Sequence, residues 1–301
     1  MNTDTRPTLF NPLILLILGA VCISFAPVFV KLVGESRLGP TAIGFWRTLF
    51  GALVLFAVSF LRGSRLSLSP RLLKFAVLAG FIFFVDLFVW HRSVIYSGAG
   101  MSTILANTQV FVTAILSFFI FKEKLSLRFW VAAVSAIGGI ALLVGLATDE
   151  VVFDTRYLQG IAFGLITGVV YGHYLVTMRW VSHREVIPDV MLFIAWASAF
   201  STLFLGVSAV LESVPMIPPD TASWIYLISL GLVAQALGWW AITSSLAKIV
   251  ASRAGLILLL QPTLAMVWGV LMFSEQFTPT QALGATITLT AIYFGGVRKH
   301  D

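Results

Sequence analysis

Charged residues are scarce in this 301-residue chain, where Asp, Glu, Lys and Arg together make up 11% of the sequence. A soluble domain carries about 25% charged and roughly 45–50% apolar residues, whereas 59% of this chain is hydrophobic. Water cannot solvate a surface of that composition, but a lipid bilayer can. The composition therefore predicts an integral membrane protein whose first partner is the lipid bilayer.

Several motifs that would indicate other classes of protein are missing. The single cysteine, Cys22, excludes an intramolecular disulfide. The sequence contains neither a G-x-x-x-x-G-K-[ST] phosphate loop nor an H-E-x-x-H zinc motif. The net charge of +6 comes from basic residues scattered between apolar runs, which excludes a continuous surface for nucleic acid. We therefore expect no ATP hydrolysis, no metal, no cofactor and no nucleic-acid partner.

Long apolar stretches dominate what is present. A helix needs about 20 largely apolar residues to cross about 30 Å of hydrocarbon, and the runs lack the alternation of a membrane β-barrel. The sequence predicts an all-α membrane protein with ten transmembrane helices and short connections. The ten expected spans are Leu13–Val33, Thr41–Leu61, Leu72–Ile95, Met101–Phe121, Phe129–Ala147, Leu158–Trp180, Val190–Leu211, Ser223–Ser244, Val250–Phe273 and Gln281–Val297.

The distribution of Lys and Arg predicts the orientation of these spans. Fourteen of these residues fall in segments on the face that holds the N-terminus, four fall on the opposite face, and Arg47 lies within a span. Cytoplasmic loops carry the excess of positive charge. Both termini are therefore expected in the cytoplasm.

An internal repeat is the more informative pattern. A shift of 152 residues aligns Phe121-Lys-Glu-Lys-Leu-Ser126 with Phe273-Ser-Glu-Gln-Phe-Thr278, and it places Gln109 on Gln261. Each half holds five spans, an odd number, so the two copies enter the membrane in opposite directions. The charges agree, because the Lys-Glu-Lys turn is expected inside and its Ser-Glu-Gln counterpart outside. Inverted repeats are a recurring architecture of secondary transporters, with the substrate held between the halves.

With this repeat, the chain resembles the drug/metabolite transporter superfamily, and in particular proteins with two EamA domains. The resemblance covers nearly the whole chain, and the order of its motifs is more specific than any one of them. The motifs are Phe45-Trp-Arg47, Asp86-Leu-Phe-Val-Trp-His91, the stretch from Ser97 through Glu123 to Gly138-Gly139, and a second copy with Gln261-Pro262, Glu275 and Gly284.

The resemblance implies two EamA repeats, residues 1–148 and 149–301, in one transmembrane unit. Within the superfamily the chain looks most like the YddG-type exporters of amino acids. That likeness implies a multi-pass protein of the bacterial inner membrane with a central cavity between the repeats, and it requires no oligomer. One departure is Gln109-Val110, where the ninth span has Gln261-Pro262. The sequence therefore does not predict that the two helices bend alike.

Charges inside the membrane are costly and are functional candidates by default. Arg47 and Asp86 lie well inside the expected spans. Arg47 is a candidate gate or contact for a substrate carboxylate, and Asp86 is a candidate amine contact or proton carrier. A structural ion pair between the two is the alternative. His91, one turn beyond Asp86, is expected at the membrane interface.

Amide and aromatic side chains are the remaining candidates for substrate binding. Amides in a span must find hydrogen-bond partners without water, either in a ligand or in a neighbouring helix. Aromatic residues either line an apolar pocket or simply pack. The candidates are Trp90, Asn107, Gln109, Tyr171, His173, Trp239 and Gln261. Glu123 and Glu275, at equivalent turns of the repeat, are expected to cap or tether helices.

These features together predict a secondary transporter that exports small metabolites of low net charge by alternating access, amino acids with aromatic or other large apolar side chains first among them. Multidrug efflux and sugar-phosphate or nucleotide-sugar transport are the alternatives, although a phosphate would require deep Lys or Arg. An intramembrane enzyme, either a transferase or a protease, is the rival class. It is disfavoured because Asp86 is the one acid deep in a span, so paired carboxylates are missing. A receptor remains compatible with the sequence, although no loop is large enough to bind a partner domain.

Overall fold

The computed structural model describes residues 11–34, 38–122, 125–145, 154–185, 189–246 and 257–296. These residues form helices joined by short connections, and no strand occurs among them. The helices are α1 (Pro12–Ser24), α2 (Ala26–Gly34), α3 (Pro40–Leu61), α4 (Pro70–Ser97), α5 (Ala99–Ala106), α6 (Gln109–Phe121), α7 (Leu127–Val144), α8 (Thr155–Arg184), α9 (Val190–Leu211), α10 (Thr221–Ser229), the π-helix η1 (Leu230–Gly238), α11 (Trp239–Leu246), α13 (Leu260–Phe273) and α14 (Pro279–Gly296).

The helix starts follow from local sequence. Asp154, Asp189 and Asp220 each precede a helix, and each side chain accepts a hydrogen bond from a backbone N–H in the first turn. Such caps satisfy donors that a helix leaves unpaired at its N-terminus. Proline opens α3 and α4, where its missing N–H costs nothing.

Eight helical segments of the described chain are long and apolar enough to cross a membrane, by length and composition. They include α1 continued by α2, α5 continued by α6, and α10 continued through η1 into α11. The all-helical membrane class is therefore confirmed. The ninth and tenth expected spans overlap α13, a shorter apolar helix, and α14. The count of ten spans stays a prediction, because the start of the ninth, residues 250–256, lies outside the described residues.

The two sequence halves form helices at equivalent positions. The bounds of α7 and α14 coincide after the shift of 152 residues, and α6 and α13 both end at the repeated phenylalanine, Phe121 and Phe273. The next residue is left-handed in both copies, with φ and ψ of 57° and 32° at Lys122 and 51° and 34° at Ser274. Both helices also start near their repeated glutamine, so Val110 in place of Pro262 does not change where the helix begins.

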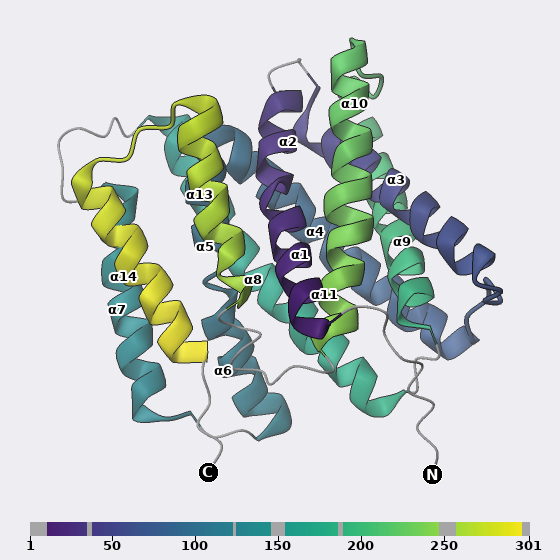
Figure 1. Cartoon of the computed structure of the whole chain (residues 1–301), viewed down its shortest axis with the longest axis horizontal. Coiled ribbons are helices and arrows are strands. Elements are labelled where there is room, and N and C mark those ends of the chain that lie inside the picture. Colours follow the sequence, from purple (N-terminus) through teal and green to yellow (C-terminus); the bar gives the residue numbers. More distant parts are fainter. Residues whose placement is uncertain are drawn as a thin grey trace.

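The helices pack so that α4 lies among α3, α5, α8 and α9. The α7–α14 pair lies together at one side of the molecule, while α3 and α9 lie at the other (Figure 1). The start of α1 and the end of α14 lie toward the same edge of Figure 1. We call the opposite end of the molecule, where α2 and α4 end and α3 and α10 begin, the outer end, because the charge distribution predicts that it is external.

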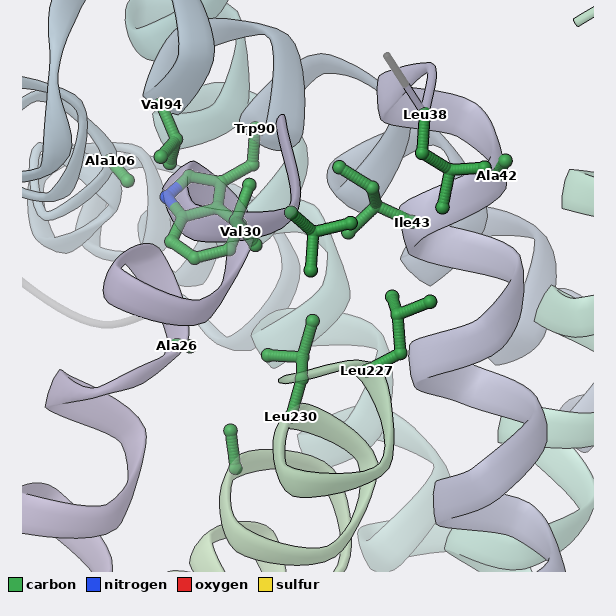
Figure 2. Close-up of a cluster of buried hydrophobic side chains, with 12 residues drawn as sticks. Ala26, Val30, Leu38, Ala42, Ile43, Trp90, Val94, Ala106, Leu227 and Leu230 are labelled. Atoms are coloured by element: carbon green, nitrogen blue, oxygen red, sulfur yellow. The ribbon is translucent and has the colours of Figure 1, made fainter. Parts of the chain in front are cut away.

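A buried apolar cluster joins the two halves of the chain (Figure 2). Ala26 and Val30 come from α2, Trp90 from α4, and Leu227 and Leu230 from α10 and the start of η1. The cluster fixes α4, and with it Asp86, relative to helices of both halves.

Candidate functional site

Arg47 is a buried guanidinium in the middle of the helix bundle, on α3 and only 4% exposed. Its Nε donates to Oε1 of Gln235 at 3.1 Å. The Gln235 amide in turn donates from Nε2 to Oγ of Ser198 on α9, also at 3.1 Å. The guanidinium carbon lies 5.4 Å from the centroid of the Trp90 ring. Arg47 is therefore held from three helices, while its Nη1 has no hydrogen-bond partner among the residues that the structure describes.

Gln235 owes its position to an unusual segment of backbone. It lies in η1, and π-helical turns inside membrane or soluble helices occur frequently at functional sites. Gly51 on α3 makes room for it, because a Cβ on Gly51 would lie 2.7 Å from Cβ of Gln235. Gln235 is 1% exposed, and its side chain forms hydrogen bonds with Arg47 and Ser198. The amide therefore orients Arg47.

Asp86 on α4 is the acid of this region and is 7% exposed. It interacts electrostatically with Arg47, Tyr171 and Tyr174. Its Oδ1 is buried without a hydrogen-bond partner in the described part of the chain. The ion pairs among the described residues join other groups, so Arg47 and Asp86 attract one another without a direct ion pair. The two charges each retain an unpaired polar atom.

The two tyrosines that interact with Asp86 belong to a group of aromatic side chains. Phe83 of α4, Tyr171 and Tyr174 of α8, and Trp239 at the start of α11 form one group, which we call the aromatic box. Trp239 has its ring centroid 6.1 Å from that of Phe83 and 6.2 Å from those of Tyr171 and Tyr174. The indole Nε1 of Trp239 is buried and has no hydrogen-bond partner in the part of the chain that the structure describes. The box therefore offers apolar area, and its two tyrosines interact electrostatically with Asp86.

The structure thus brings together five of the nine residues predicted from sequence: Arg47, Asp86, Trp90, Tyr171 and Trp239. Trp90 also packs in the cluster of Figure 2, so it serves both packing and the contact with Arg47.

The three predicted amides, Asn107, Gln109 and Gln261, make other contacts. Asn107 donates to the Thr103 carbonyl at 2.8 Å, and Gln109 accepts from Thr113 at 2.9 Å, so both bond within their own segment. Gln261 is half-buried in the first turn of α13. In the described ranges, the hydrogen bonds of these amides do not reach Arg47 or Asp86, and the amides flank the two equivalent helix starts instead.

His173 and His91 lie in different surroundings. His173 is exposed on α8, on the same side as the exposed Leu165, Ile166 and Val169, so the structure does not bring it to the aromatic box. His91 is fully buried against Gly44, and it interacts electrostatically with Arg47 and Arg92. His91 therefore lies inside the helix bundle, because α4 continues beyond it to Ser97, and its level at the membrane interface stays a prediction.

Sequence reasoning missed Gln235, Ser198, Phe83 and Tyr174 as members of this region. Gln235 carried a usable signal, since it is an amide in the middle of the eighth expected span, like those that were singled out. Phe83 carried none, because phenylalanine is common throughout the chain.

The outer end is held by charged contacts between the two halves. Lys31 Nζ lies 2.6 Å from Oε1 of Glu275, and Arg92 Nη2 lies 2.6 Å from Oε1 of Glu212. Glu275 also accepts from the N–H groups of Ala99 at 2.9 Å and Gly100 at 3.4 Å, at the start of α5. The prediction that Glu275 caps and tethers helices is confirmed. Glu123 lies outside the described residues.

These features define a multi-pass helical membrane protein with a buried, unpaired Arg and Asp beside an aromatic box. The chain belongs to the EamA-like transporter family, whose model matches twice, at residues 11–145 and 158–295. The chain is therefore a membrane transporter built from two EamA-like repeats. The boundaries 1–148 and 149–301 stay a prediction.

Similar proteins support this assignment. A protein of Clostridium kluyveri described as an uncharacterized transporter is 24% identical over 90% of this chain and 88% of its own length. The uncharacterized inner membrane transporter YhbE of Escherichia coli strain K12 is 23% identical over 93% of this chain and 92% of its own. One solved crystal structure has a TM-score of 0.65 at 16% identity and covers 94% of this chain and 95% of that chain, which shows the fold alone.

Proposed function

We propose that this transporter exports amino acids with aromatic or other large apolar side chains across the bacterial inner membrane by alternating access between its two repeats. The observation that carries the proposal is the buried pair Arg47 and Asp86, which attract each other. Among the described residues, Nη1 of Arg47 and Oδ1 of Asp86 have no hydrogen-bond partner. Buried polar groups normally find partners. A zwitterion supplies both of them at once, a carboxylate for Arg47 and an ammonium for Asp86.

The aromatic box provides the third contact. Phe83, Tyr171, Tyr174 and Trp239 present apolar area beside Asp86, where the side chain of a bound amino acid would lie. An apolar pocket discriminates by only about 1–3 kcal/mol per methylene. We therefore expect broad specificity among large apolar side chains. Phosphorylated sugars fit less well, because a dianion would require further cations beside Arg47.

The cellular location rests on the relatives. YhbE is described as an inner membrane transporter, and the excess of basic residues on the face of the N-terminus predicts cytoplasmic termini. Substrate would then enter from the cytoplasm and leave at the outer end, which requires that the pairs Lys31–Glu275 and Arg92–Glu212 separate.

A transport assay tests the proposal. Proteoliposomes loaded with labelled Phe should lose it faster than protein-free liposomes, and unlabelled Met or Trp should compete. Trp239→Ala should raise the half-saturating Phe concentration about tenfold, the effect of about 1.4 kcal/mol, because it removes one wall of the box. The matched control is Trp130→Ala, since Trp130 lies exposed on α7 and outside the site. If amino acids of every kind fail while a sugar phosphate or a cationic drug is transported, the proposed substrate class is wrong.

A further inference from the structure

A crevice of about 480 Å³ lies between α7 and α14, away from the aromatic box. Arg128, Ala132 and Ser135 line it from α7, and Thr286, Thr290 and Phe294 line it from α14. From Arg128 to Ser135 the crevice follows α7 for about 10 Å, at about 1.5 Å per residue. Apolar surface makes up most of its lining, with Arg128 at one end.

Arg128 is the charged group of this crevice. It is the second residue of α7 and is exposed, and its guanidinium carbon lies 4.9 Å from the centroid of the Phe294 ring. A residue at the end of a membrane-spanning helix lies at the level of the lipid headgroups. The N-terminus of α7 adds a partial positive charge there. The Arg128 guanidinium therefore lies over the Phe294 ring, at the level of the lipid phosphates.

The residues deeper in the crevice can contact the ester groups and the acyl chains of a lipid. Val131, Ala132 and Ile287 present apolar surface. Ser135 and Thr290 are exposed, and their hydroxyls can donate to ester oxygens. Gly138, one turn beyond Ser135, leaves open space, since a Cβ there would meet no atom within 4 Å.

A second copy of the chain is a poorer occupant than a lipid. Neither α7 nor α14 contains an acidic residue. A symmetric contact through these helices would bring Arg128 to an apolar surface without a counter-ion, which is costly. A lipid phosphate brings the counter-ion with it, and basic pockets between transmembrane helices bind anionic headgroups.

We propose that the α7–α14 crevice binds an anionic phospholipid, with its phosphate on Arg128 and an acyl chain along Ala132 and Ser135. The site does not depend on the proposed transport substrate.

Native mass spectrometry of the detergent-purified full chain tests this. The protein is incubated with equal amounts of phosphatidylglycerol and phosphatidylethanolamine that carry the same acyl chains. Wild type and Arg128→Lys should retain the anionic lipid about fivefold better than the zwitterionic one, since one basic residue contributes about 1 kcal/mol. Arg128→Gln should lose the preference. The control Arg65→Gln, in an exposed connection, should keep it with the same change in net charge.

A second variant separates the crevice from general surface charge. Ser135→Phe fills the crevice but keeps Arg128, and it should reduce retention of both lipids. Equal retention of the two lipids by wild type, or an unchanged preference in Arg128→Gln, overturns the proposal. A dimer that persists in Arg128→Gln and dissociates in Ser135→Phe also overturns it, because the crevice then seats a second copy. If Arg128→Gln is not monodisperse, Ser135→Phe and Arg128→Lys decide the outcome.

Discussion

At the scale of single residues, the centre of this protein is a network of polar side chains in which only some atoms have hydrogen-bond partners among the described residues. Gln235 and Ser198 complete one side of Arg47, and Thr202 donates to Thr48 at 2.8 Å nearby. Within the described ranges of the chain, Oδ1 of Asp86 and Nε1 of Trp239 have no such partners. Under the proposed function, a bound substrate would supply the missing partners and offset the cost of these unpaired groups.

Asp86 gives the first residue-scale prediction. It is the one acid within the predicted spans, and it faces Arg47, Tyr171 and Tyr174. If it carries a proton during transport, Asp86→Asn should abolish the pH dependence of Phe efflux, because the amide cannot titrate. Efflux from proteoliposomes over a series of pH values measures this.

The matched control for Asp86→Asn is Asp220→Asn. Asp220 caps α10 from an exposed position, and asparagine caps a helix equally well. The control should transport with an unchanged pH response. An unchanged response in Asp86→Asn would rule out the proton-carrier role and favour facilitated diffusion, whereas a misfolded Asp86→Asn would support a structural role for the charge.

At the scale of elements, close helix contacts explain several glycines. Gly139 of α7 faces Thr288 of α14, and a Cβ on Gly139 would lie 2.5 Å from Oγ1 of Thr288. Gly284 similarly approaches Gly139 and the backbone of Leu143. In lipid, where apolar burial does not drive helices together, small residues allow the backbone approach that holds them.

The α7–α14 contact predicts opposite outcomes for two adjacent glycines. Gly139→Ala should lower the thermal stability of the purified protein, since overpacking costs about 1–3 kcal/mol. Gly138→Ala should leave it unchanged or raise it slightly, because its Cβ enters open space and alanine favours the helix. Thermal melts in one detergent compare them. Equal effects of the two substitutions would contradict the packing argument.

The Glu275 tether predicts a coupling between two substitutions. Glu275→Gln should destabilise the protein, because it leaves Lys31 without its counter-ion and weakens the cap on α5. Lys31→Met combined with Glu275→Gln should cost less than the sum of the two single changes, since neither charge is then left unpaired. Strict additivity would show that the pair contributes nothing. Gly98 belongs to this turn: its φ is 95°, and a Cβ there would lie 2.8 Å from Oε1 of Glu275.

At the scale of the whole molecule, the repeat organises both the ends and the centre. Each described ion pair at the outer end joins a residue of the first half to a residue of the second, and the Arg47 network also crosses the halves through Gln235. The most extensive helix contacts also join the two halves, among them α7 with α14, α4 with α8, and α3 with α9.

The inverted repeat makes a prediction about topology. Lys122 and Ser274 occupy equivalent left-handed positions and are both exposed. In a background without Cys22, single cysteines at these two positions should react with an impermeant thiol reagent from opposite faces of the membrane, Ser274→Cys from outside intact cells. Labelling of both from the same side would contradict the inverted topology.

The sequence by itself determined the membrane class, eight of the ten predicted spans, the repeat and the family. These features follow from which residues the chain contains and from their order in the sequence, so they can be read without the folded structure. The sequence also pointed to Arg47, Asp86 and the capping role of Glu275, because a charge in hydrocarbon or at a repeated turn stands out locally.

Only the tertiary structure decided which side of each helix is buried and which helices contact one another. It buried His91 but exposed His173, and it paired Arg47 with Gln235, which lies 188 residues away. The aromatic box likewise draws on α4, α8 and α11, which are far apart in the chain. Contacts of this kind depend on helix rotation and crossing in three dimensions, and almost uniformly apolar helices carry little periodic pattern from which to read that rotation.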